Sequence, residues 1–240
     1  MDLLVSIINA TDAFVWGVPM IVILLGTHLF MTVRTGFIQR KLGTGIKLSV
    51  KKDPDAVGDI SQFGALTTAL AATIGTGNIV GVATALVAGG PGALLWMWLT
   101  GVFGIATKYS ETYIALKYRV KDHNGNMIGG AMYALERGLK NKKLGRVLAL
   151  IFAAFAAIAS FGIGSAVQAN SLSSAVVSVA PADSWLTSSF VFLGISTSWL
   201  QIIVGILVVI LVSIVIFGGI HTISNVCERL VPFMAIFYVL

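Results

Sequence analysis

Charged side chains are scarce in this sequence. Of its 240 residues, 11% are Asp, Glu, Lys or Arg, whereas 57% are hydrophobic. A water-soluble domain carries about 25% charged residues, so this chain has too little polar surface to fold as one in water. Residues 60–107, 147–182 and 184–227 contain no charged residue at all. We expect these three stretches to lie in a lipid bilayer.

Residues that build catalytic and metal sites are also few. Cys227 is the single cysteine, which excludes a disulfide within the chain and a cysteine-based metal or redox cluster. The three histidines share no metal-ligand spacing, and a Gly-x-Ser-x-Gly elbow is missing. The stretch "GTGNIVG" (75–81) is one residue longer than a dinucleotide fingerprint and lacks βαβ surroundings. We therefore expect neither an enzyme nor a bound organic cofactor.

The hydrophobic stretches are long enough for several membrane spans, since a transmembrane helix needs roughly 20 apolar residues. The run after Arg229, "LVPFMAIFYVL", has 11 residues, and we expect the sequence to stop inside that span. The segment before it, "GGIHTISNVCER", is predicted as a turn. The predicted spans are about 14–33, 62–88, 93–116, 147–178 and 200–218, with a sixth starting near 230.

Positive charges are concentrated between particular spans. Six of the 16 Lys and Arg residues fall in 34–52, nine in 108–146, and one is Arg229. These places share one side of the membrane if the five spans are real, and excess positive charge is typical of the cytoplasmic side. We predict cytoplasmic basic segments at 34–60 and 117–146, an extracellular loop at 180–199, and an outside N-terminus in the cell membrane. Nothing in the basic pattern indicates nucleic-acid binding.

The stretch "AATIGTGNIVG" (71–81) is unusual for a membrane helix. Gly77 and Gly81 have the spacing that lets membrane helices pack closely. Residues 73–78 also suit a broken helix, in which freed N–H groups bind an anionic substrate group and freed carbonyls coordinate sodium. Asn78 offers both a donor and an acceptor, and would be costly in lipid without a partner. The two interpretations are compatible.

The coupling ion can be considered from the same region. Proton-coupled carriers usually hold a carboxylate or a histidine within the membrane, and neither occurs in the break region or the fourth span. Neutral oxygens suit sodium instead. Lys108 and Glu111, at the inner end of the third span, are predicted to form a local pair or a gate.

The stretch "GGPGALLWMWLTGVFG" (89–104) resembles the signature of the alanine/glycine:cation symporter family, the sodium:alanine symporters. Leu95 stands where that family usually has Phe. The resemblance covers essentially the whole chain. Further similar stretches are "GDISQFGALTTALAATIGTGNIVGVAT" (58–84), "ATKYSE" (106–111), "GGAMYALERGL" (129–139) and "FGIGSAVQANS" (161–171).

The resemblance implies an all-α polytopic protein with a leucine-transporter-like fold, of the amino acid–polyamine–organocation type. That fold has two inverted five-helix repeats, here preceded by one extra helix and represented by the first repeat only. It implies symport of sodium with alanine or glycine by alternating access, with sodium as coupling ion and a monomer as sufficient unit. From the residues alone, an ion channel or a non-transporting membrane scaffold remains the rival interpretation.

The resemblance also implies roles for individual residues. The N–H groups of Thr76 and Gly77 would hold the substrate carboxylate, and the Thr73 carbonyl its ammonium. Asn78 and Gln168 would contact the amino acid through their side chains. The remaining assignments are sodium at the carbonyls of Ala71 and Ile74, helix break and packing at Gly75 and Gly81, pocket walls or plain packing at Phe161 and Ile163, and interface anchoring at Trp96, Met97 and Trp98.

Overall fold

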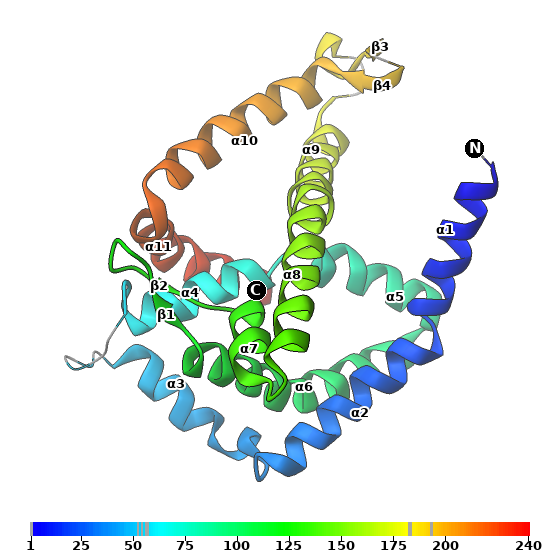
Figure 1. Cartoon of the computed structure of the whole chain (residues 1–240). Coiled ribbons are helices and arrows are strands. Elements are labelled where there is room, and N and C mark those ends of the chain that lie inside the picture. The colour runs from blue at the N-terminus through cyan, green and yellow to red at the C-terminus, as the bar shows by residue number, and fades with distance from the viewer. Residues whose placement is uncertain (1, 52, 54, 56–57, 182–183, 193) are drawn as a thin grey trace.

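The computed structural model describes residues 2–51, 53, 55, 58–181, 184–192 and 194–240, and it is mostly helical (Figure 1). The helices are α1 (Asp2–Val15), α2 (Val18–Arg34), α3 (Leu42–Val50), α4 (Gln62–Thr73), α5 (Val82–Gly89), α6 (Pro91–Lys117), α7 (Ala131–Gly138), α8 (Lys142–Ala159), α9 (Val167–Val179), α10 (Trp199–Phe217) and α11 (Gly219–Val239). Shorter turns are the 3-10 helices η1 (Ile38–Lys41) and η4 (Trp185–Thr187) and the π-helices η2 (Gly77–Gly81) and η3 (Ser160–Ala166).

Three helices are long and apolar enough to cross a membrane, namely Leu3–Arg34, Lys142–Val179 and Trp199–Phe217. The helical segments Gln62–Thr73 and Gly77–Gly89 are bent by 57° relative to each other, and together they would make a fourth span. The first of these begins well before the predicted start at residue 14, because α1 continues the apolar run toward the N-terminus. Helix α6 covers the predicted span 93–116. It is not among the described helices that are apolar enough to cross a membrane. The number of spans therefore stays a prediction.

Two β-hairpins depart from the all-α prediction. The pair β1 (Val120–Lys121) and β2 (Met127–Ile128) surrounds the polar turn at 122–126. The pair β3 (Ser189–Phe192) and β4 (Ile195–Ser198) lies in the segment 180–199, which we predicted as an extracellular loop. Aromatic and β-branched residues in this loop favour strands. Residues 182, 183 and 193 of the loop, and 52, 54, 56 and 57 of the first basic segment, lie outside the described residues.

Helix α11 corrects a second prediction. We expected a turn through "GGIHTISNVCER", but the chain turns only at Gly218 and Gly219 and is then helical to Val239. Gly219 has a φ of +69°, which a glycine adopts without strain. Ser224 and Glu228, which follow it, lie against the start of α4, and Pro232 lies inside the helix.

Helices α4 and α11 lie side by side and pack closely (Figure 1). Thr67 on α4 and Ser224 and Val231 on α11 are at most 3% exposed. Gly64 is buried here as well, and a Cβ at that position would collide with the Ser224 hydroxyl. This contact fixes α4, the helix that leads into the predicted site.

Helix α2 packs along α6 in a second interface. The Nδ1 of His28 lies 2.8 Å from the Thr107 hydroxyl. Gly104 faces the His28 ring, and Ala106 is fully buried. Most other large apolar side chains are exposed in this chain, as expected of surfaces that face lipid or further protein.

Candidate functional site

The predicted break is an interruption between two helical segments. Helix α4 ends at Thr73, and the segment from Gly77 to Gly89 runs at 57° to it. Ile74 has an extended backbone with a ψ of 113°, and the helix resumes as the π-helical turn η2. Thr73 and Ile74 are β-branched and Gly75 is the weakest helix former of the three, so the local sequence favours an interruption here.

The side chain of Asn78 closes the interruption. The side-chain Oδ1 accepts the Gly75 N–H at 3.2 Å, and the backbone N–H of Asn78 donates to the Gly75 carbonyl at 3.1 Å. The Ile74 N–H donates to the Leu70 carbonyl at 2.8 Å. The carbonyls of the last turn of a helix lack partners from a following turn. Carbonyl oxygens near Ala71 and Thr73 are therefore exposed to whatever occupies the break.

Gln168 approaches the break from α9. Its Oε1 accepts the Thr76 N–H at 3.1 Å. A Cβ on Gly75 would lie 3.0 Å from Nε2 of Gln168, so the amide lies directly against the glycine backbone. The structure thus brings together the two segments that the resemblance assigns to one centre. An amide oxygen accepts at the same backbone donor that a carboxylate oxygen would use.

Helix α11 contacts both sides of the break. The Ser61 hydroxyl, which caps α4 by accepting the Gly64 N–H at 2.8 Å, donates to Oε1 of Glu228 at 2.7 Å. Beyond the break, the Tyr238 hydroxyl donates to the Asn78 carbonyl at 2.9 Å. Sequence reasoning missed Glu228 because residues 218–229 were interpreted as a turn, and it missed Tyr238 because the run 230–240 was interpreted only as the start of a span. The spacing of Ser224, Glu228 and Val231, which is typical of one helix face, could have indicated the helix.

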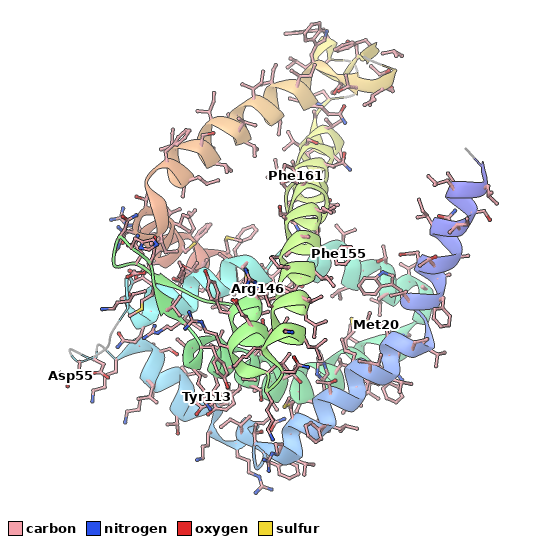
Figure 2. The ribbon with its side chains drawn as sticks, viewed as in Figure 1. Met20, Asp55, Tyr113, Arg146, Phe155 and Phe161 are labelled. Atoms are coloured by element: carbon pink, nitrogen blue, oxygen red, sulfur yellow. The ribbon has the colours of Figure 1, made fainter. Side chains whose placement is uncertain are left out.

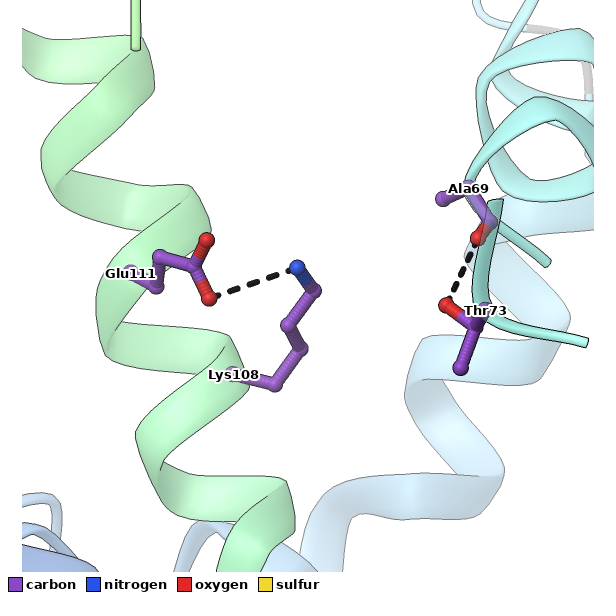
Figure 3. A network of polar contacts seen from close by, with 4 residues as sticks. All are labelled: Ala69, Thr73, Lys108 and Glu111. Atoms are coloured by element: carbon purple, nitrogen blue, oxygen red, sulfur yellow. Dashed lines mark hydrogen bonds and ion pairs between the residues drawn. The ribbon is translucent and has the colours of Figure 1, made fainter. Parts of the chain in front are cut away.

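Lys108 and Glu111 form the predicted local pair. Their Nζ and Oε2 atoms are 3.3 Å apart, and both side chains are about two-thirds exposed, at 65% and 63%. Figure 3 shows Lys108 directed from α6 toward the end of α4, where the Thr73 hydroxyl donates to the Ala69 carbonyl at 2.8 Å. An exposed pair of this kind contributes little to stability.

The other predicted residues include aromatic side chains on α6 and η3 and the two glycines of η2. Phe161, in η3, is 82% exposed, and Figure 2 shows it on the α8–α9 column. Trp96 and Trp98 are exposed on α6, with Met97 half-buried between them. A Cβ on Gly77 would meet no atom within 4 Å, and one on Gly81 only the Thr76 carbonyl at 3.9 Å. The described chain thus offers that glycine pair no neighbouring helix. Ile163 belongs to η3.

At the break, the described residues offer backbone carbonyl, hydroxyl and side-chain amide oxygens as ligands for a cation. In the part of the chain that the structure describes, no three His, Cys, Asp or Glu residues are grouped closely enough to hold a metal ion. Carbonyl oxygens at Ala71 and Ile74 and the nearby threonine hydroxyls are hard donors of the type that sodium accepts. These oxygens are polar and carry no formal charge.

Comparison with known proteins gives a consistent picture. The model of the sodium:alanine symporter family matches residues 1–240. The sodium/alanine symporter AgcS of Methanococcus maripaludis is 49% identical over 98% of this chain and 49% of its own length. Two Bacillus subtilis proteins are similar as well. The putative sodium/proton-dependent alanine carrier protein YrbD is 35% identical over 97% of this chain and 44% of its own length. The probable sodium/glutamine symporter GlnT is 30% identical over 99% of this chain and 46% of its own length. The chain thus spans about half the length of these relatives.

Proposed function

Because the chain belongs to the sodium:alanine symporter family, we propose that it is part of a membrane transporter that couples inward sodium movement to uptake of a small neutral amino acid, alanine or glycine. The observation that carries this proposal is the interrupted helix at residues 74–76, with Gln168 bound to its backbone. Broken helices of this type bind substrate and ions in many secondary transporters.

The substrate carboxylate takes the backbone donors of Thr76 and Gly77 in this proposal. These N–H groups begin the second half-helix, and the positive end of its dipole favours an anion. A carboxylate arriving there replaces the Gln168 oxygen at the Thr76 N–H, and the Gln168 amide can then donate to it. The substrate ammonium binds the Thr73 carbonyl, and Asn78 contacts the amino acid or the cation.

Sodium binds the carbonyls of Ala71 and Ile74 in the same proposal, with no further cofactor. The backbone at Gly75 lies so close to Gln168 that little volume remains beside it. This close approach supports a small substrate such as alanine or glycine. In this proposal both ligands bind at the bend between α4 and the half-helix that begins at Gly77. Alternating access then follows from a change in the angle between these two segments.

The architecture we propose for the whole protein is the leucine-transporter-like inverted repeat. The broken helix is the first helix of a repeat, and the long helix Leu3–Arg34 is the extra one before it. The basic segments face the cytoplasm and the N-terminus lies outside, as the distribution of Lys and Arg indicates. The protein is a transporter of the cell membrane rather than an enzyme, and a monomer is sufficient.

The experiment is alanine uptake into proteoliposomes that contain the full-length protein, with a sodium or a potassium gradient. We expect saturable uptake in sodium that is lost in Asn78→Ala and Gly77→Leu. Gly43→Leu on α3 is the matched control, because a Cβ there also meets no atom within 4 Å, and it should leave uptake intact. Equal uptake in both salts, or active Asn78→Ala and Gly77→Leu variants, contradicts sodium symport. Single-channel currents without saturable uptake identify a channel. The absence of both currents and uptake indicates a scaffold.

A further inference from the structure

A strongly basic cavity lies where α6, α7 and α8 meet, away from the helix break. Its volume is about 640 Å³. Six cationic side chains line it, namely Lys117, Arg119, Arg137, Lys142, Lys143 and Arg146. Glu136 is the one carboxylate in the lining. The cavity therefore carries a large excess of positive charge in a small volume.

The walls of this cavity are held in place by close helix packing. Gly145 on α8 is buried against α7, and a Cβ there would lie 2.6 Å from the Leu135 carbonyl. Gly138 packs against the Tyr118 ring in the same way, at 3.2 Å. Asn141 caps α8 by accepting the Leu144 N–H at 3.1 Å. The cationic side chains thus project from fixed backbone.

One acidic side chain, Glu136, stands among the six cations that line the cavity. The ion pair Lys108–Glu111 lies outside this lining. The Lys117 ammonium lies over the Tyr118 ring, 5.7 Å from its centroid, and the Lys142 ammonium donates to the Arg137 carbonyl at 2.7 Å. A cluster of Lys and Arg side chains is suited to an anion with several oxygens, above all a phosphate group.

An apolar cavity adjoins the basic one and shares Lys117 and Tyr118 with it. Its volume is about 610 Å³, and its walls include Ile114, Leu135 and Phe152. Figure 2 shows Arg146 and Phe155 on the same helix, and at 1.5 Å per residue they are about 14 Å apart along its axis. Exposed apolar side chains follow Arg146 along α8, including Leu150 and Phe155. Charge and apolar surface thus meet at one boundary.

We propose that the basic cavity binds the phosphate headgroup of an anionic phospholipid and that the adjoining apolar cavity receives part of an acyl chain. A free phosphate would use the basic cavity alone, whereas the second cavity and the apolar face of α8 fit a lipid. Basic pockets between membrane helices on the cytoplasmic side bind anionic headgroups by this chemistry. The proposal does not depend on what the protein transports.

The test is native mass spectrometry of the purified full-length protein with phosphatidylglycerol and with phosphatidylcholine of the same acyl chains. We expect phosphatidylglycerol to be retained preferentially. Removing two cations in Lys143→Gln/Arg146→Gln should weaken its binding about 25-fold, at about fivefold for each cation near the membrane surface. The matched control is Lys41→Gln/Lys47→Gln, which removes two cations from η1 and α3 outside the cavity and should bind as the unmodified protein does.

Two competitors separate the sources of phosphate. We expect neither inorganic phosphate nor glycerophosphoglycerol, the headgroup without chains, to displace the lipid at equal concentration. Displacement by either would show that the apolar cavity contributes nothing and would overturn the lipid assignment. Equal retention of the two lipids, or equal losses in the double variant and its control, would overturn the site itself.

Discussion

Replacing Gln168 by Glu tests the substrate site with one nearly isosteric change. The Gln168 oxygen accepts the Thr76 N–H at 3.1 Å. A carboxylate in its place makes a charge-assisted hydrogen bond to the same donor. Hydrogen bonds that involve a charged group contribute about 1.5–3 kcal/mol, against about 0.5–1.5 kcal/mol for neutral ones. The Glu side chain therefore holds the Thr76 N–H about 1 kcal/mol more tightly, which weakens the competing binding of the substrate carboxylate about fivefold.

The new charge also opposes the substrate directly. Two like charges about 4 Å apart repel by about 4 kcal/mol at an effective dielectric constant of 20, and water in the open site reduces that figure. Together the two effects predict a rise of at least tenfold in the KM for alanine in Gln168→Glu. The measurement is the concentration dependence of sodium-driven alanine uptake into proteoliposomes that contain the full-length protein.

Asn170→Asp is the matched control for the added charge. Asn170 follows Gln168 by two positions on α9, about 200° around the helix, so it faces away from the break. We expect its KM to stay within twofold of the unmodified protein. An unchanged KM in Gln168→Glu would refute the proposed carboxylate site, and an equal rise in both variants would assign the effect to charge in the membrane rather than to this contact.

Three further substitutions test the packing around the site. Gly64→Ala forces a methyl group against the Ser224 hydroxyl and Oε1 of Glu228 and should destabilise the protein by about 1–3 kcal/mol; adding Ser224→Ala should restore part of the thermal midpoint, because the Glu228 contact at 2.6 Å remains. Tyr238→Phe removes the hydrogen bond to the Asn78 carbonyl and should lower uptake several-fold without changing the thermal midpoint by more than a few degrees. Gly145→Ala brings a Cβ within 2.6 Å of an α7 carbonyl and should lower the thermal midpoint, which circular dichroism or intrinsic fluorescence can follow.

The sequence predicted those features that depend on local chemistry. Thr73, Ile74 and Gly75 are poor helix formers in a row, and the helix is interrupted there. In the basic segment 117–146, the residues "DHNGN" (122–126) are typical of a turn and the spacing in "AMYALERGLKN" is typical of an amphipathic helix, and the structure has a hairpin turn and helix α7 there. In each case a few neighbouring residues decide the backbone conformation, so one sequence is enough to predict it.

Features that depend on distant partners were not predicted. The glycines at 218 and 219 and the polar residues after them are typical of a turn, yet α11 is helical because its polar face packs on α4. Ser224 and Glu228 look unsuited to a membrane helix until Gly64 and Ser61 are placed beside them. The contact between Tyr238 and Asn78 joins residues 160 positions apart. Tertiary packing of this kind overrides local propensity and leaves no signal within a short window.

The position of α11 constrains how the broken helix can move. Its contact through Glu228 holds Ser61 at the start of α4, and its contact through Tyr238 holds Asn78 beyond the break. The 57° bend lies between these two points. A change in the bend while α11 stays rigid must therefore stretch or break one of the two hydrogen bonds. Since Gly64 and Ser224 pack tightly near Ser61, we expect the Tyr238 bond to break before the Glu228 bond if the bend changes.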